Sequence, residues 1–87
     1  MLEPYVINVF LEDEGTRSPF RLRVSRPKKT DGETDYYCLV NAPTLFKGDK
    51  KIFGASEEQA RELALQFVKQ LLGDRKLIDN NGQYVQL

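Results

Sequence analysis

The chain has 87 residues, enough for one compact domain and too few for two, so we expect a single domain over residues 1–87. Its apolar content of 40% favours a folded chain over a disordered one. With 13 basic side chains, 13 acidic ones and no histidine, the composition excludes a globally cationic nucleic-acid binder, histidine-based catalytic triads and imidazole zinc sites.

Cysteine content and hydropathy predict the compartment. Cys38 is the one cysteine, so no disulfide can form within the chain, which fits a reducing environment. The opening residues lack a basic stretch, and Glu3 and Pro4 interrupt the apolar run, which is not typical of a signal peptide. No apolar stretch approaches the roughly 20 residues of a membrane helix. We therefore expect a soluble, cytoplasmic protein without a membrane partner.

Alternating apolar and polar residues predict two paired strands in the first third of the chain. Residues Tyr5–Glu12 are rich in β-branched and aromatic side chains, and Phe20–Arg26 alternates apolar residues with arginines. Glycine and proline within Asp13–Pro19 indicate a turn. The two strands should therefore form an antiparallel hairpin.

Two further strands are predicted in the middle of the chain. A polar loop over Pro27–Asp35 precedes the third strand, Tyr36–Ala42, on which Tyr36, Cys38 and Val40 share one face. A turn over Pro43–Asp49 leads to a short fourth strand, Lys50–Ala55, which Gly54 ends.

The spacing after Gly54 predicts an amphipathic helix. Ser56 is a favourable N-cap, and Gln59 three residues later completes a capping box. Gly73 is a natural C-terminal stop. Leu65 falls on the flank, where Tyr84 or Val85 could reach it. The predicted buried stripe is Ala60, Leu63, Ala64, Phe67, Val68, Leu71 and Leu72.

The C-terminal residues predict a small hairpin or an edge strand. Asn81 and Gly82 are a type I′ turn signal between the segments 76–79 and 83–87. The predicted fold class is α+β: an antiparallel sheet of about four strands with one amphipathic helix across one face, in the order ββββα plus a short C-terminal β segment.

Three segments carry a resemblance to a known family. They are Arg26-Pro27, the "YYC" of Tyr36–Cys38, and "FGASEEQARELAL", Phe53–Leu65. Together they resemble a bacterial family of small domains of unknown function, in which the last segment has the pattern G-x-[DS]-x-x-QA-x-x-LAL. The resemblance implies a βββα-type fold and nothing about activity.

A second, partial likeness concerns nucleic acid. The segment 47–72 is similar to the last strand and helix of a double-stranded-RNA-binding domain, where basic residues at the start of the helix meet phosphates. Here Glu57 and Glu58 take those positions and would repel phosphates, and a strand replaces the expected N-terminal helix.

A basic run is the main charge feature. Thr16–Thr30 contains six basic residues and no acid, and Lys47, Lys50 and Lys51 would join it if the fourth strand lies nearby. It predicts either a binding patch for an acidic partner or a phosphate backbone, or a solvated strand face balanced by acids at both ends. The six residues are Arg17, Arg21, Arg23, Arg26, Lys28 and Lys29.

One helix can cover only one face of the predicted sheet. Aromatic, leucine and arginine side chains on the uncovered face are the types enriched in protein interfaces. A symmetric homodimer, another protein partner, bases stacked on the aromatics, or the C-terminal segment could cover that face. The predicted uncovered residues are Val6, Asn8, Phe10, Arg21, Arg23, Tyr37 and Leu39, and our candidate partner-binding residues are Phe10, Arg21, Arg23, Tyr37 and Leu39.

No residue pattern indicates catalysis. Cys38 lies in an apolar strand and is expected to be a buried, inert thiol. The acidic clusters lack calcium-loop spacing, and the glycines form no nucleotide-binding fingerprint, so we predict no enzyme activity, cofactor or metal. The predicted function is a protein-interaction module that self-associates or binds a protein partner through the uncovered face. The alternative is a weak nucleic-acid-binding module that uses the basic patch Arg17–Lys29 and exposed aromatics.

Overall fold

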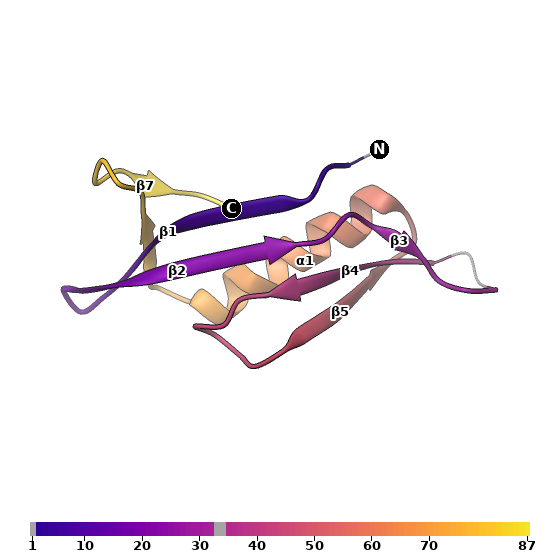
Figure 1. The fold of residues 1–87 in the computed structure, drawn as a ribbon, viewed down its shortest axis with the longest axis horizontal. Coiled ribbons are helices and arrows are strands. Elements are labelled where there is room, and N and C mark those ends of the chain that lie inside the picture. Colours follow the sequence, from indigo (N-terminus) through magenta and orange to yellow (C-terminus); the bar gives the residue numbers. More distant parts are fainter. Residues whose placement is uncertain (1, 33–34) are drawn as a thin grey trace.

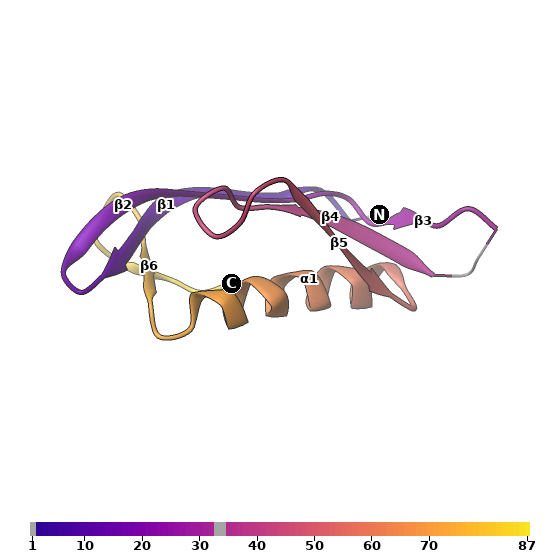
Figure 2. The same cartoon turned by 90° about the horizontal axis from the view of Figure 1, so that it is seen from below.

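The computed structural model describes residues 2–32 and 35–87. Within them, seven strands form one antiparallel sheet, and a single helix, α1, lies against one of its faces (Figures 1 and 2). Positions 33 and 34 lie outside the described residues. They belong to the predicted loop Pro27–Asp35, and one of them is an acid that was expected to balance the basic run. The elements are β1 Tyr5–Asp13, β2 Thr16–Val24, β3 Lys28–Lys29, β4 Tyr36–Asn41, β5 Asp49–Gly54, α1 Glu57–Leu72, β6 Lys76–Ile78 and β7 Tyr84–Val85.

The α+β class and the single helix agree with the sequence prediction, but the strand count does not. The prediction of about four strands is wrong because β3, β6 and β7 also join the sheet. Each of these has only two or three residues, which is too short for an alternating pattern to be recognised. The order across the sheet is β3-β4-β2-β1-β6-β7, and β5 pairs with the other edge of β4.

The first hairpin is tighter than predicted. Asp13 pairs with Thr16, so the loop consists of Glu14 and Gly15 alone, both with positive φ (51° and 81°). Positive φ at both positions is the mark of a type I′ turn, whose twist matches that of the strands. Pro19, predicted to end the turn, lies inside β2 opposite Phe10.

The C-terminal hairpin exists, but its predicted type I′ turn is wrong. Gly82 has a φ of 80°, whereas Asn81 has no positive φ. The carboxylate of Asp79 organises the loop instead, because its Oδ1 accepts hydrogen bonds from the backbone N–H groups of Asn81 (2.8 Å) and Gln83 (3.0 Å). A local carboxylate–backbone turn has therefore replaced the backbone geometry that the Asn-Gly pair favours.

Ser25 joins β2 and β3 into one edge along β4. Its backbone N–H donates to the carbonyl of Leu39 (2.9 Å), and its Oγ accepts from the N–H of Leu39 (2.8 Å). The Ser25 hydroxyl thus accepts the hydrogen bond that a backbone carbonyl would accept in a regular strand, at the point where the chain bends before Pro27. As a result, β4 is paired along both edges.

The core lies between the sheet and α1. Small residues of the helix let it approach the sheet closely, and Gly54 at the end of β5 is the tightest point, since a Cβ there would lie 2.8 Å from Cα of Ala60. Its buried residues include Leu11, Phe20, Leu22, Val24, Cys38 and Val40 from the strands and Ala60, Ala64, Val68 and Leu72 from the helix.

The N-cap Ser56 and the stop at Gly73 are confirmed for α1, while the predicted stripe is only partly right. The Gln59 side chain accepts from the N–H of Ala55 rather than of Ser56. Ser56 Oγ accepts from the N–H of Gln59 (3.1 Å), and the helix ends before Gly73. However, Leu63 and Leu71 are 36% and 40% exposed, whereas Leu65 packs against the core. The buried face is therefore rotated toward Leu65 and away from the flank that carries Leu63 and Leu71.

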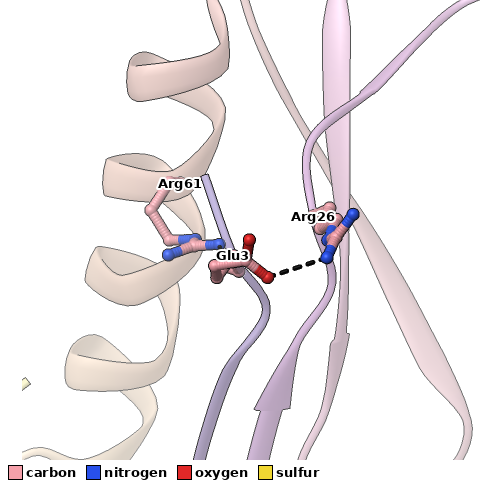
Figure 3. A network of polar contacts seen from close by, with 3 residues as sticks. All are labelled: Glu3, Arg26 and Arg61. Carbon is pink, nitrogen blue, oxygen red and sulfur yellow. Dashed lines mark hydrogen bonds and ion pairs between the residues drawn. The ribbon is translucent and has the colours of Figure 1, made fainter. Parts of the chain in front are cut away.

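The two flanks of α1 face different neighbours. On the Leu65 side, the guanidinium of Arg61 donates to the carbonyl oxygen of Glu3, and the carboxylate of Glu3 pairs with Arg26 at 2.7 Å (Figure 3). On the other side, Phe67 meets Phe46 of the β4–β5 connection, with 5.8 Å between ring centroids. The flank that carries Leu63 and Leu71 thus lies toward β5.

The C-terminal tail packs on the helix side of the sheet. Val85 and Leu87 pack against the core, and Figure 2 shows this tail running beside α1. Of the alternatives raised from the sequence, coverage of the opposite sheet face by the C-terminal tail is therefore wrong, and Ile78 lies beside Phe10 as part of the sheet. In the part of the chain that the structure describes, no helix is long and apolar enough to cross a membrane.

Candidate functional site

The sheet face opposite α1, hereafter the outer face, carries the candidate partner-binding residues. Strand alternation places Arg21 and Arg23 of β2 and Tyr37 and Leu39 of β4 on this face, while their neighbours Leu22 and Val24 point into the core. The cross-strand pairs are Arg21–Asn8, Arg23–Val6, Arg23–Asn41, Leu39–Lys51, Tyr37–Phe53 and Tyr37–Lys28.

A concavity of about 690 Å³ occupies the centre of the outer face. Leu39 and Val6 supply its apolar surface, and exposed cations surround them. The one carboxylate in its lining, Asp49, accepts a hydrogen bond from the side-chain amide of Asn41 (2.9 Å). The lining residues are Val6, Arg21, Arg23, Ser25, Lys28, Leu39, Asn41 and Asp49. An apolar centre with a cationic rim is suited to an anionic partner.

An aromatic pair lies beside this concavity. The rings of Tyr37 and Phe53 are 5.9 Å apart between centroids and tilted by 48°. The Lys51 ammonium lies 5.0 Å from the centroid of the Tyr37 ring, a cation–π contact. Phe53 is 51% exposed, so the pair extends the apolar surface toward the β5 edge.

The structure brings four of the five candidate residues together and leaves Phe10 apart. Arg21, Arg23 and Leu39 line one concavity, and Tyr37 follows two positions from Leu39 along β4. Phe10 lies on the same face but near the other end of the sheet, opposite Pro19 on β2 and Ile78 on β6. Ile78 is buried, and Phe10 is half-buried beside it.

The basic run divides into paired and unpaired residues. Arg17 lies 3.7 Å from Glu12, and Arg26 pairs with Glu3. Among the residues that the structure describes, no ion pair involves Arg21, Arg23 or Lys28. These three cations are therefore available to a partner.

Strand β5, the predicted fourth strand, contributes only one of its lysines to the outer face. Lys51 lies on the outer face, whereas Lys50 belongs to the opposite face and sits 5.9 Å from the Phe46 ring. The helix side carries exposed acids, Glu58 and Glu62. The helix side also carries exposed basic residues, Lys50 and Lys69, so acids and bases occur together there.

Cys38 is buried, as predicted, and faces α1. Burial raises the pKa of its thiol above the ordinary 9.0, and the neighbouring Arg61 guanidinium lowers the pKa in part. A protonated, inaccessible thiol is a poor nucleophile. Within the described ranges, no cluster of three or more acidic or cysteine side chains is arranged to hold a metal ion.

Phe53 and Lys51 are outer-face residues that were not among the five candidate partner-binding residues, although Lys51 was a possible addition to the basic run. The signal was present, because alternation within Lys50–Gly54 puts Lys51 and Phe53 on one face. Their register against Tyr37 and Leu39 could not be predicted, since alternation does not give strand pairing.

Comparisons of the chain with protein-family models, with curated proteins and with solved structures found no match. The resemblance to the bacterial family of small domains therefore stays a prediction.

Proposed function

We propose that this chain is a non-enzymatic protein-interaction module that binds an acidic protein segment on its outer face. The observation that carries the proposal is the concavity in which Leu39 and Val6 lie among Arg21, Arg23 and Lys28. An apolar side chain of the partner would cover Leu39, and flanking carboxylates would accept hydrogen bonds from the two guanidinium groups.

Charge complementarity favours such a partner over a second copy docked face to face. A twofold contact presents the same patch on both sides, so Arg21, Arg23 and Lys28 would meet their own equivalents. Like charges brought together and desolvated oppose association. A segment with carboxylates next to apolar residues removes that cost.

Single-stranded nucleic acid is the second candidate, supported by the Tyr37–Phe53 pair, of which Phe53 is exposed, beside basic residues. Two features weigh against it. The 48° tilt between the Tyr37 and Phe53 rings gives no flat surface on which successive bases could stack. The Lys51 ammonium also already lies against the Tyr37 ring. The protein partner therefore has the stronger support.

The test measures binding of two labelled probes, a peptide of alternating glutamate and leucine residues and an oligothymidylate. We expect the peptide to bind more weakly as salt rises, because the contacts are ionic. Replacing both Arg21→Glu and Arg23→Glu should weaken peptide binding by at least about tenfold. Arg17→Glu is the control for each single replacement, since it makes the same charge change as Arg21→Glu or Arg23→Glu alone, but outside the concavity, and should leave affinity near its original value.

Circular dichroism of each variant checks that the fold persists. Failure of the peptide to bind, or equal losses in the control and the double variant, would overturn the proposal. Binding of the oligothymidylate without the peptide, with affinity falling steeply with salt, would support the nucleic-acid function instead.

A further inference from the structure

A long strand edge is open on one side of the sheet. β5 pairs with β4 over all six of its residues, from Asn41–Asp49 to Tyr36–Gly54. No strand within residues 2–32 and 35–87 pairs with its other edge, which runs along the border of the sheet in Figure 1. On the opposite border β7 has only two residues, and β6 pairs with β1 only at Phe10–Glu12, so Tyr5–Val9 of β1 also has no strand on that side among the described residues. Unpaired backbone groups on a long edge are a template for another strand.

Exposed apolar side chains gather on both sides of this edge. Phe53 projects on the outer face and is 51% exposed. Beneath the edge, α1 carries Leu63 and Leu71 on the flank that faces β5, and they are 36% and 40% exposed. The only other large apolar residues with comparable exposure among those described are Val6 and Tyr84. Clustering of this kind marks an interaction surface.

We propose that two copies of the chain associate through β5, forming one continuous antiparallel sheet across a twofold axis. Their α1 helices would then lie side by side through Leu63 and Leu71. This contact differs from the outer face and leaves both copies of the concavity open on the same side. The inference therefore does not depend on the proposed partner.

The sequence of β5 favours one register. Paired residues must point to the same face, so the twofold axis lies midway between one residue of β5 and the same residue of the partner strand. An axis at Ile52 sets Ile52 opposite the partner's Ile52, and Lys51 opposite the partner's Phe53. Lys51 already makes a cation–π contact of 5.0 Å with Tyr37, so it can lie near a second aromatic ring. An axis at Lys51 would instead oppose two lysines.

A second copy suits this edge better than an unrelated strand. The register at Ile52 is self-complementary, and the helix flank meets an identical apolar flank. A twofold contact occupies the β5 edges of both copies at once, so association through this edge stops at a dimer. A chain of 87 residues gains stability from the extra burial.

The first experiment measures mass by sedimentation equilibrium over a range of concentrations. We expect a rise from 10.0 kDa toward twice that value. Phe53→Lys and Leu63→Lys, placed on the two sides of the edge, should each raise the dissociation constant by at least about tenfold. Tyr84→Lys is the matched control on the far edge, where the side chain is 68% exposed, and should leave the constant unchanged.

The second experiment locates the contact by amide hydrogen exchange. If β5 pairs with its equivalent, amides of Asp49–Gly54 should gain protection as the concentration rises. A monomer at all concentrations up to about millimolar would overturn the proposal. So would a dimer that Arg21→Glu dissociates while Phe53→Lys and Leu63→Lys do not. Leu63 lies on the helix surface, so that variant remains informative even if Phe53→Lys fails to fold.

Discussion

The ionisation of the Cys38 thiol is controlled by the residues that surround it. Cys38 lies on the core face of β4, fully buried, with the guanidinium of Arg61 as its charged neighbour. Burial raises the thiol pKa more than Arg61 lowers it, so the folded chain binds the thiol proton more tightly than the unfolded chain does. Ionisation of this residue is therefore linked to unfolding.

This linkage predicts a pH dependence of stability. The contribution of Cys38 is complete below the unfolded-state pKa, near 9.0, and is lost as the pH rises through the folded-state pKa. Urea unfolding of the native chain and of Cys38→Ala, at neutral pH and above pH 9.0, isolates the effect. The native chain should lose more unfolding free energy than the variant above pH 9.0. Parallel pH profiles for the two proteins would contradict the prediction.

The sequence predicts which single side chains point into the core and which point to solvent. Alternation predicts that Leu22 and Val24 are buried while Arg21 and Arg23 are exposed, as the structure has them. The grouping of Leu39 with Arg23 does not follow, because it depends on β2 pairing with β4 rather than with another strand.

At the scale of elements, the first hairpin shows a compromise in its turn. Its two-residue loop requires positive φ at both positions, and Gly15 suits this geometry while Glu14 does not. A side chain other than glycine, asparagine or aspartate at such a position costs about 1 kcal/mol. Pairing of the two strands therefore holds Glu14 in a backbone conformation that is unfavourable for glutamate.

Replacing Glu14→Asn should stabilise the protein by about 0.5–1 kcal/mol, because asparagine tolerates the left-handed conformation. Thermal and urea unfolding measure the gain. Glu14→Ala serves as the control, since it removes the same charge and keeps the unfavourable φ, and it should bring no such gain. Equal stabilisation by both variants would point to the charge rather than to the backbone.

Elements differ in how well the sequence predicts them. The helix boundaries follow from Ser56, Gln59 and Gly73, which act through local hydrogen bonds and backbone conformation. The two-residue strand β3 forms beside β4 and has no local pattern that predicts it, whereas Asn81 and Gly82 predict the hairpin of β6 and β7 but not the pairing of β6 with β1. The rotation of α1 toward Leu65 likewise reflects the position of the helix beneath β4 and β5.

Across the whole molecule, stability should be graded from β4 outward. β4 is paired along both edges and packs on α1, whereas β7 is a two-residue edge strand. Local opening needs the least free energy where few contacts are lost. In dilute protein, amide exchange should therefore be slowest in Cys38–Val40 and fastest in Tyr84–Val85. Slower exchange in β7 than in β4 would contradict this order.

The close approach of β5 and α1 has a consequence for how this fold can vary. The atoms that would crowd a side chain at Gly54 are the backbone N and Cα of Ala60 and the backbone carbonyl carbon of Gln59. Trimming a side chain elsewhere cannot restore that room, because no side chain occupies it. A damaging change at position 54 therefore has no simple second-site suppressor, and only a shift of the entire helix could rescue it.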